Sequence, residues 1–282
     1  MHIRSRLVSL AVTALFVRPI MAGGGPFLTD ALSIAAGKTY LFTSSALSVS
    51  DNPANLANLT DPSLGFSISQ FYLVKGLQQG AFAFAYPAYK GSAGLSLLYF
   101  GDALYNERQV GLAYGYQIDP EVASMGVRLV YQQVSLREYG TVSGLTADIG
   151  ISAKLKKFTF AGHIFNVFQT RLAQYADERF MSQVAFGVAY KSSEYLTFAT
   201  QIDKPLVGKP TFRAGIRFTP TEKWLFAVGG GGSPFYGTLG IGLNLSNFKA
   251  VLGIAQHLYL GTQAHLSVFW TFGKKQEQGK EE

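Results

Sequence analysis

The feature that most constrains this chain is an alternation of apolar with small or polar residues that runs from Ser63 almost to its end. In segment 145–155, for instance, leucine, isoleucine and alanine alternate with threonine, aspartate, glycine, serine and lysine. A period of two indicates β-strands, because successive side chains of a strand point to opposite faces. About 14 segments of roughly ten residues repeat the pattern, which is the length that a tilted membrane strand needs.

The two faces of these strands indicate what surrounds them. One face is apolar and aromatic, whereas the other carries glycine, alanine, serine and glutamine. A soluble β-sandwich also alternates, but its outward face would be rich in lysine, glutamate and threonine. The pattern therefore favours an all-β fold: a transmembrane, antiparallel, up-and-down β-barrel of about 14 strands with a short N-terminal helical plug.

The start of the chain predicts export. Residues 1–22 resemble a secretory signal, with Arg4 and Arg6 before the apolar run 7–16 and Ala22 at the expected cleavage site. That run is shorter than the ~20 residues that span a bilayer, and no later run is as long. The chain has no cysteine, so disulfides cannot stabilise it. Export without a spanning helix predicts a closed barrel in the outer membrane of a Gram-negative bacterium, in contact with its lipid.

Connections between the predicted strands alternate in length. The eight later strands are expected near residues 158–167, 180–190, 194–202, 210–218, 223–229, 235–245, 247–256 and 262–272. Short turns, such as Lys156-Lys157, alternate with longer connections, such as Ser135–Ser143 and Gln169–Arg179. In outer-membrane barrels the short turns are periplasmic and the long loops external. The barrel should therefore occupy residues 61–272, followed by a charged periplasmic tail at 273–282.

Residues 23–60 lack the alternation and are expected to form the plug. Thr29-Asp30 can cap a helix over Ala31–Ala36, and Gly37 can end it in a left-handed conformation. A second helix is expected after Asn52, with Pro53 at its first position, where the missing N–H costs nothing. An ordinary helical linker before a sheet is the alternative interpretation.

Several ionisable residues fall on the inward faces of the predicted strands. They are Arg128, Asp148, Lys154, His163, Arg213 and Arg217, accompanied by Gln183 and Gln201. One interpretation is that they form pairs that fix the plug to the wall, because buried charges need partners. The other is a polar, lumen-lining path with a mild preference for anions.

Enzyme chemistry and nucleic-acid binding find little support in the sequence. Histidines share no metal-ligand spacing, and no nucleophile motif is present, so we expect no metal, no cofactor and no catalysis. Gly37-Lys38-Thr39 is not a phosphate loop, because Leu32 stands where its first glycine would fall. The formal charge of +7 falls to +4 once the three arginines of the signal are removed, and it is not clustered.

The segment before the first strand resembles the start of the FadL-like outer-membrane barrels, and most of all their PorV/PorQ branch. The resemblance lies in Gly37–Tyr40, Ala46-Leu47 and the Asn52-Pro53-Ala54-Asn55-Leu56-Ala57 turn. It implies a plug motif made by Gly37, Asn52, Pro53, Ala54 and Leu56 inside a 14-stranded barrel.

Two functions follow from that resemblance. A PorV/PorQ-like protein would act by protein contact in type IX secretion, and its partners would be secretion components or secreted cargo. Segments Ser135–Ser143 and Gln169–Arg179 would then be its docking surface. The alternative is a FadL-like passive channel for hydrophobic small molecules, which would pass beside the plug and through the wall.

Overall fold

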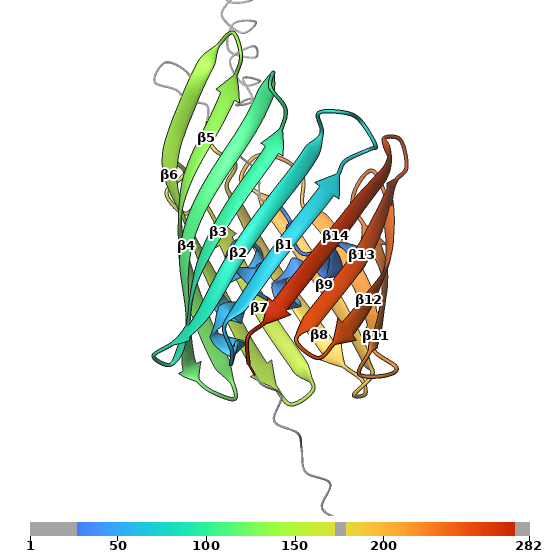
Figure 1. The fold of residues 1–282 in the computed structure, drawn as a ribbon. Helices are drawn as coiled ribbons and strands as arrows, with labels where there is room; N and C mark the ends of the chain where they lie inside the picture. The colour runs from blue at the N-terminus through green and yellow to red at the C-terminus, as the bar shows by residue number, and fades with distance from the viewer. Residues whose placement is uncertain (1–26, 173–178, 274–282) are drawn as a thin grey trace, which may run out of the picture.

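The structure, a computed structural model, describes residues 27–172 and 179–273. The predicted signal at 1–22 lies outside the described residues, as does all of the predicted tail except Gly273. The described chain forms a closed antiparallel barrel of fourteen strands, with a helical segment in its interior (Figure 1). The predicted fold class and strand number are confirmed.

Each strand pairs with the next one in sequence, and β1 closes the barrel on β14 in register from Ser63↔Thr271 to Gln70↔Ala264. The strands are β1 (Ser63–Gln70), β2 (Gln78–Ala88), β3 (Gly91–Gly101), β4 (Tyr105–Asp119), β5 (Ala123–Leu136), β6 (Gly140–Leu155), β7 (Phe158–Phe165), β8 (Gln183–Lys191), β9 (Leu196–Pro205), β10 (Thr211–Phe218), β11 (Trp224–Gly231), β12 (Tyr236–Leu245), β13 (Phe248–His257) and β14 (Gly261–Thr271). The eight later strands lie where the alternation predicted them.

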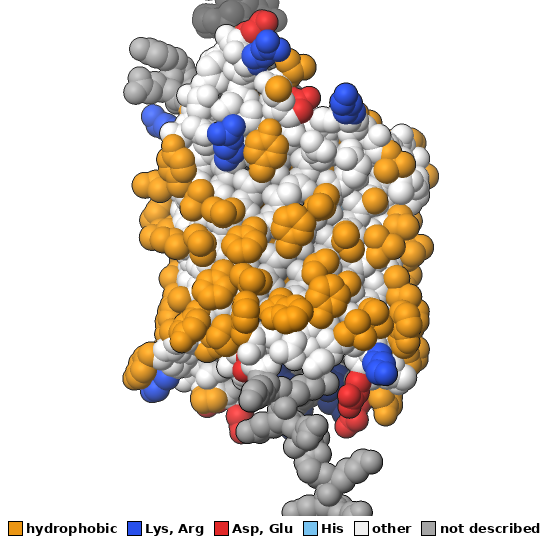
Figure 2. Space-filling model, viewed as in Figure 1, with side chains coloured by type: hydrophobic (Ala, Val, Ile, Leu, Met, Phe, Trp, Pro, Cys, Tyr) orange, Lys and Arg blue, Asp and Glu red, His pale blue; other side chains and the backbone are white. Residues whose placement is uncertain are grey.

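The alternation leaves large apolar side chains on the outside of the barrel. Leu112, Leu129 and Phe212 are each more than 60% exposed. Figure 2 shows hydrophobic side chains spread over the middle of one face, with lysine and arginine toward its two ends. Hydrocarbon is the solvent that suits such a surface, since soluble monomers rarely expose so large an apolar patch. In the described residues, no helix has the length and apolar character needed to cross a membrane.

The barrel has two distinct ends. At the turn end, where β1 begins and β14 ends, the connections are short, such as 89–90, 156–157 and 246–247. At the opposite, loop end, the connections include 71–77 and the long segment 166–182. The predicted alternation of short and longer connections is therefore present, although several connections at the loop end are also short.

The prediction of a long loop at Ser135–Ser143 is wrong, because most of this segment belongs to strands β5 and β6. Strands β5 and β6 stay paired as far as Leu136↔Gly140, so only residues 137–139 form a turn. The hairpin projects above the rest of the rim (Figure 1). Its pairing persists because inward Val134 packs with Leu172 and Phe180, which gives the hairpin a small core. The second predicted docking loop, Gln169–Arg179, lies partly outside the described residues.

The plug consists of four short helices inside the barrel. They are α2 (Ala31–Ala35), the 3₁₀ helix η1 (Tyr40–Phe42), α3 (Ser48–Asp51) and the 3₁₀ helix η2 (Pro53–Asn58). The first predicted helix is confirmed within one residue: Asp30 caps it by accepting from the Leu32 N–H at 2.8 Å, and Gly37 follows at φ +75°. The second begins at Pro53 as predicted, but it is a 3₁₀ helix. Asn52 caps it by accepting from the Ala54 N–H at 3.2 Å.

A belt of inward glycines makes room for this plug. A Cβ atom at any of them would meet a plug atom within 3.0 Å; the set is Gly65, Gly94, Gly115, Gly126, Gly150, Gly187, Gly215, Gly229, Gly240 and Gly253. They lie on ten different strands. The missing side chains let the plug pack directly against the wall backbone: plug backbone atoms lie there at Gly115, Gly126, Gly150, Gly215, Gly229 and Gly253, and plug side chains at the other four. The strand face that carries small residues in the sequence is therefore largely the surface against which the plug packs.

This packing predicts the effect of a single added side chain. Gly126→Val would push a side chain into the Pro53–Ala54 peptide, and overpacking of this kind typically costs about 1–3 kcal/mol. We expect a lower thermal midpoint in detergent and faster proteolysis of the plug. Gly80→Val is the matched control, because a Cβ atom there meets nothing within 4 Å. Equal behaviour of the two variants would contradict the role of the belt.

Candidate functional site: the plug and the cavity above it

The Asn-Pro-Ala motif holds the plug in its folded shape. The Nδ2 atoms of Asn52 and Asn55 both donate to the Leu41 carbonyl, at 3.3 Å and 2.9 Å. Asn55 also donates to the Thr43 carbonyl at 2.9 Å. Asn52, Ala54 and Leu56 are fully buried, or nearly so. Buried amides that satisfy backbone carbonyls connect η1 to η2, so the predicted motif residues are structural parts of the plug.

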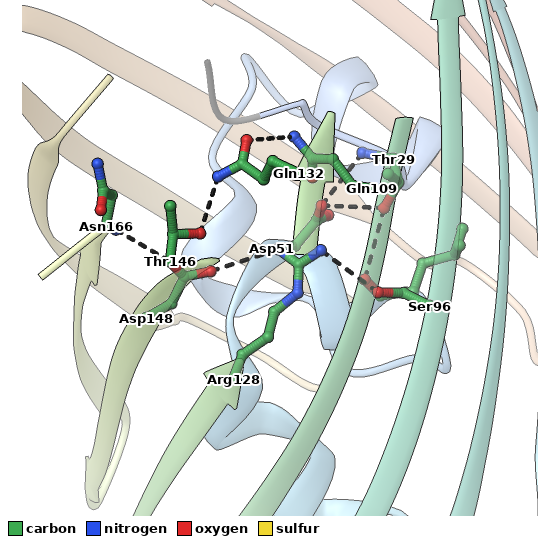
Figure 3. Close-up of polar contacts among 10 residues, drawn as sticks. Thr29, Asp51, Ser96, Gln109, Arg128, Gln132, Thr146, Asp148 and Asn166 are labelled. Carbon is green, nitrogen blue, oxygen red and sulfur yellow. Dashed lines mark hydrogen bonds and ion pairs between the residues drawn. The ribbon is translucent and has the colours of Figure 1, made fainter. Parts of the chain in front are cut away.

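Arg128 and Asp148 form a buried ion pair in the wall beside the plug. Their Nη1 and Oδ2 atoms are 3.3 Å apart, and both side chains are almost completely buried. Arg128 also donates to the Ser96 hydroxyl at 3.3 Å, while the other oxygen of Asp148 accepts from the Asn166 N–H at 2.9 Å. Figure 3 shows this network spanning several strands next to Asp51 of the plug. The pair therefore links the strands that carry it.

Asp51 attaches the first residues of the plug to α3. Its Oδ1 atom accepts from both the N–H and the hydroxyl of Thr29 at 3.1 Å, and its Oδ2 atom has no partner. It lies in the plug, outside the membrane-spanning strands. Burial, with a further contribution from the negative charge of Asp30, raises the pKa of the Asp51 carboxyl to about 7.

The other predicted lumen residues are spread over the barrel and do not form one cluster. Arg213 donates to the Lys38 carbonyl at 3.0 Å, and Arg217 donates to the Thr43 hydroxyl at 3.3 Å. Both arginines thus connect the wall to the plug. His163 is buried, with neither ring nitrogen bonded in the described structure, whereas Lys154 is exposed near the turn end of β6. A single chain of charges along the lumen is not present.

A cavity of about 400 Å³ lies between the plug and the loop end. Its apolar side includes Phe27, Phe71 and Phe100, whose rings are in contact at centroid distances of 5.1 Å and 5.8 Å. Leu28, Ile34 and Leu77 add aliphatic surface. This cavity cannot be predicted from the strand pattern, because Phe27 precedes the plug helices and Phe71 and Leu77 lie in a connection. Their only sequence signal was an excess of apolar residues outside the strands.

Polar side chains line this cavity, here called the upper cavity, beside the aromatic cluster: His265 contacts the Phe71 ring at a centroid distance of 5.7 Å, and Gln79 pairs in register with Phe100. Gln79, Ser69 and His265 lie in one row across β2, β1 and β14, and His265 accepts from or donates to Ser69 at 2.8 Å. Lys38 enters from the plug, where its ammonium donates to Gln263 at 3.3 Å. Burial, assisted by the nearby charge of Arg213, lowers the pKa of the Lys38 ammonium to about 8. The upper cavity is thus lined by aromatic rings with hydrogen-bonding groups next to them.

Comparison with known proteins identifies the fold. No family model matches the sequence, and no curated protein matches it. Among solved structures, the barrel is similar to those of FadL-like transporters. The Ralstonia pickettii toluene transporter TbuX aligns with a TM-score of 0.62 at 11% identity, over 86% of this chain and 98% of that one.

Two further structures agree with that likeness. The Pseudomonas putida toluene transporter TodX has a TM-score of 0.62 at 11% identity, over 90% of this chain and 97% of its own. A Pseudomonas aeruginosa FadL homologue has a TM-score of 0.61 at 10% identity, over 89% and 100%. At these identities the likeness shows the fold alone, a barrel fold that this chain shares with those three proteins. None of the comparisons supports the PorV/PorQ branch or type IX secretion.

The described residues contain no group of three or more histidine, aspartate or glutamate side chains placed to hold a metal ion. The proteins with similar structures are transporters and channels.

Removing one member of the Arg128–Asp148 pair should destabilise the barrel strongly. Arg128→Met leaves the Asp148 carboxylate buried without its cation, which typically costs about 3–5 kcal/mol. The double variant Arg128→Met/Asp148→Asn should regain part of that loss, because no unpaired charge remains. Urea unfolding in lipid vesicles measures both free energies. A single variant as stable as the wild type would show that the pair is not needed.

Asp51 should make stability depend on pH. Because its folded-state pKa of about 7 lies above the ordinary value of 3.8, the folded protein binds the proton more tightly than the unfolded chain. This contribution is complete below the ordinary value and is lost as the pH rises through 7. Asp51→Asn should therefore flatten the fall in thermal midpoint between pH 5 and pH 9. The exposed control Asp119→Asn should keep the fall in thermal midpoint seen in the wild type. If the thermal midpoint of Asp51→Asn falls as steeply with pH as that of the wild type, Asp51 is not the group responsible.

Proposed function

We propose that this protein is a passive outer-membrane channel for hydrophobic small molecules, of the FadL-like kind. The observation that supports this most is the aromatic cavity above the plug. It is enclosed by the 71–77 connection, the first plug residues and inward side chains of the wall. A concave, mostly apolar site with a few polar groups is the usual form of a small-molecule binding site. The likeness in fold to toluene transporters and a monoaromatic hydrocarbon channel supports the same class of cargo.

The orientation in the membrane follows from the connections. Longer connections of outer-membrane barrels face the outside, so the loop end is external and the turn end periplasmic. The upper cavity then faces the medium and can take up a ligand from it. Below the cavity the plug packs against the glycine belt, so the lumen is closed at that level. Passage therefore requires a movement of the plug or of the wall, and we expect a carrier-like, low-conductance path.

Uptake of a neutral aromatic probe tests this function. Cells that express the protein should accumulate N-phenyl-1-naphthylamine faster than cells with the empty vector. Leu77→Trp should fill the cavity and reduce uptake to the vector level, because Leu77 lines it. Leu73→Trp is the matched control: it lies in the same connection, is 66% exposed and does not line the cavity.

The alternative function, contact with partner proteins in secretion, predicts different experimental results. If cells with the wild-type protein show no added uptake, and a large partner copurifies stoichiometrically from outer membranes, the channel function is contradicted. A solitary barrel that copurifies with small apolar molecules supports it.

A further inference from the structure

A second cavity, of about 200 Å³, lies on the turn-end side of the plug. Inward side chains of four neighbouring strands, β7 to β10, form its wall. Ala189, Ala199 and Gly215 lie in one row across β8, β9 and β10, and their small size leaves the space empty of wall atoms. The plug covers it with Ala36, Thr39 and Phe42. We call this space the lower cavity.

A second row of inward residues on β8, β9 and β10 lies nearer the turn end, and in it one cation flanks a hydroxyl group on each side. Lys191 pairs in register with Thr197, and Thr197 pairs with Arg217. All three side chains point inward and line the lower cavity. Since neighbouring strands are about 4.8 Å apart, the Lys191 ammonium and the Arg217 guanidinium can both reach a ligand in the lower cavity that contacts the Thr197 hydroxyl. Thr159, on the adjacent strand β7, adds a second hydroxyl.

These groups have unused hydrogen-bonding capacity. Arg217 makes one side-chain bond, from Nη2 to the Thr43 hydroxyl, and its buried Nε–H has no partner. In the part of the chain that the structure describes, neither Lys191 nor Arg217 has a carboxylate oxygen within 4.0 Å. The hydroxyls of Thr159 and Thr197 likewise have no partner there, and no acidic residue lines the cavity. The carboxylate of Asp30 acts on Arg217 only from beyond ion-pair distance. A half-buried guanidinium without a directly bound anion is costly, so a bound oxyanion would supply the contact that the protein does not.

We propose that the lower cavity binds a small oxyanion, held by Arg217, Lys191 and the hydroxyl of Thr197. A guanidinium fork matches both carboxylate and phosphate, and the ammonium adds a second charge. Two sources share this chemistry: a free inorganic oxyanion of the periplasm, and the carboxylate group of a molecule that leaves the lumen. Because the cavity is bounded by both wall and plug, the bound anion stabilises the closed position of the plug.

Titration calorimetry on the full chain in lipid nanodiscs tests the site. Sodium phosphate and sodium acetate are the probes, with sodium chloride at equal ionic strength as the reference. Arg217→Met should weaken binding roughly tenfold to hundredfold, as expected for loss of hydrogen bonds to a charged group. Arg137→Met is the control, since it removes the same charge from the exposed turn of the β5–β6 hairpin. Thr197→Val should weaken binding less and keeps the charge, which preserves the test if Arg217→Met does not fold.

The outcomes separate the two sources and the two proposals. Tighter binding of phosphate than acetate assigns the site to an inorganic oxyanion, and the reverse order assigns it to a carboxylate; both support the site. No heat beyond that of chloride, or equal affinity in wild type, Arg217→Met and Thr197→Val, overturns it. The result is independent of probe uptake through the upper cavity, so either proposal can fail alone.

Discussion

Direct packing of the plug against the glycines of the barrel wall is the interaction on which the rest of this structure depends. Hydrocarbon outside the wall requires that every strand be paired, so the barrel must close on itself. A closed barrel of this size would enclose empty space if its interior were not filled. The glycine belt allows a segment of only some thirty residues to fill it, because each missing side chain lets the plug approach one strand directly. The upper and lower cavities lie on opposite sides of the plug, where it does not fill the space inside the wall.

The partners of the inward cations differ between the level of the plug and the cavities on its two sides. At the level of the plug, cations either pair with a carboxylate, as Arg128 does with Asp148, or donate to plug backbone, as Arg213 does to Lys38. Arg213 also pairs with Asp203 at 2.6 Å. Above and below this level, Lys38 and Arg217 each line a cavity, and neither has a carboxylate oxygen of the described chain within 4.0 Å. Cations without a carboxylate partner in the described chain are thus found beside cavities between the plug and the wall.

The strands could be predicted from sequence because lipid imposes a period of two on every one of them. The plug helices could be located because Asp30, Asn52 and Pro53 have local capping roles that need no tertiary information. The cavities could not, since Phe27, Phe100 and His265 are distant in sequence and meet only when the barrel closes. The polar residues of segment 135–143 predict a loop, whereas the structure has a paired hairpin. The contact of Val134 with Phe180 that supports the hairpin joins residues distant in sequence, so the local pattern does not show it. The inward glycines were visible, but their role required the position of the plug.

Single-channel recording in planar bilayers tests the central claim, that the plug closes the lumen by packing against the belt. The account predicts that the wild-type protein conducts almost no steady ionic current, and that deletion of Asn52–Leu56 produces discrete open levels, since that segment contacts Gly94, Gly115, Gly126 and Gly150. A large, steady conductance in the wild type, or no change after the deletion, would contradict it.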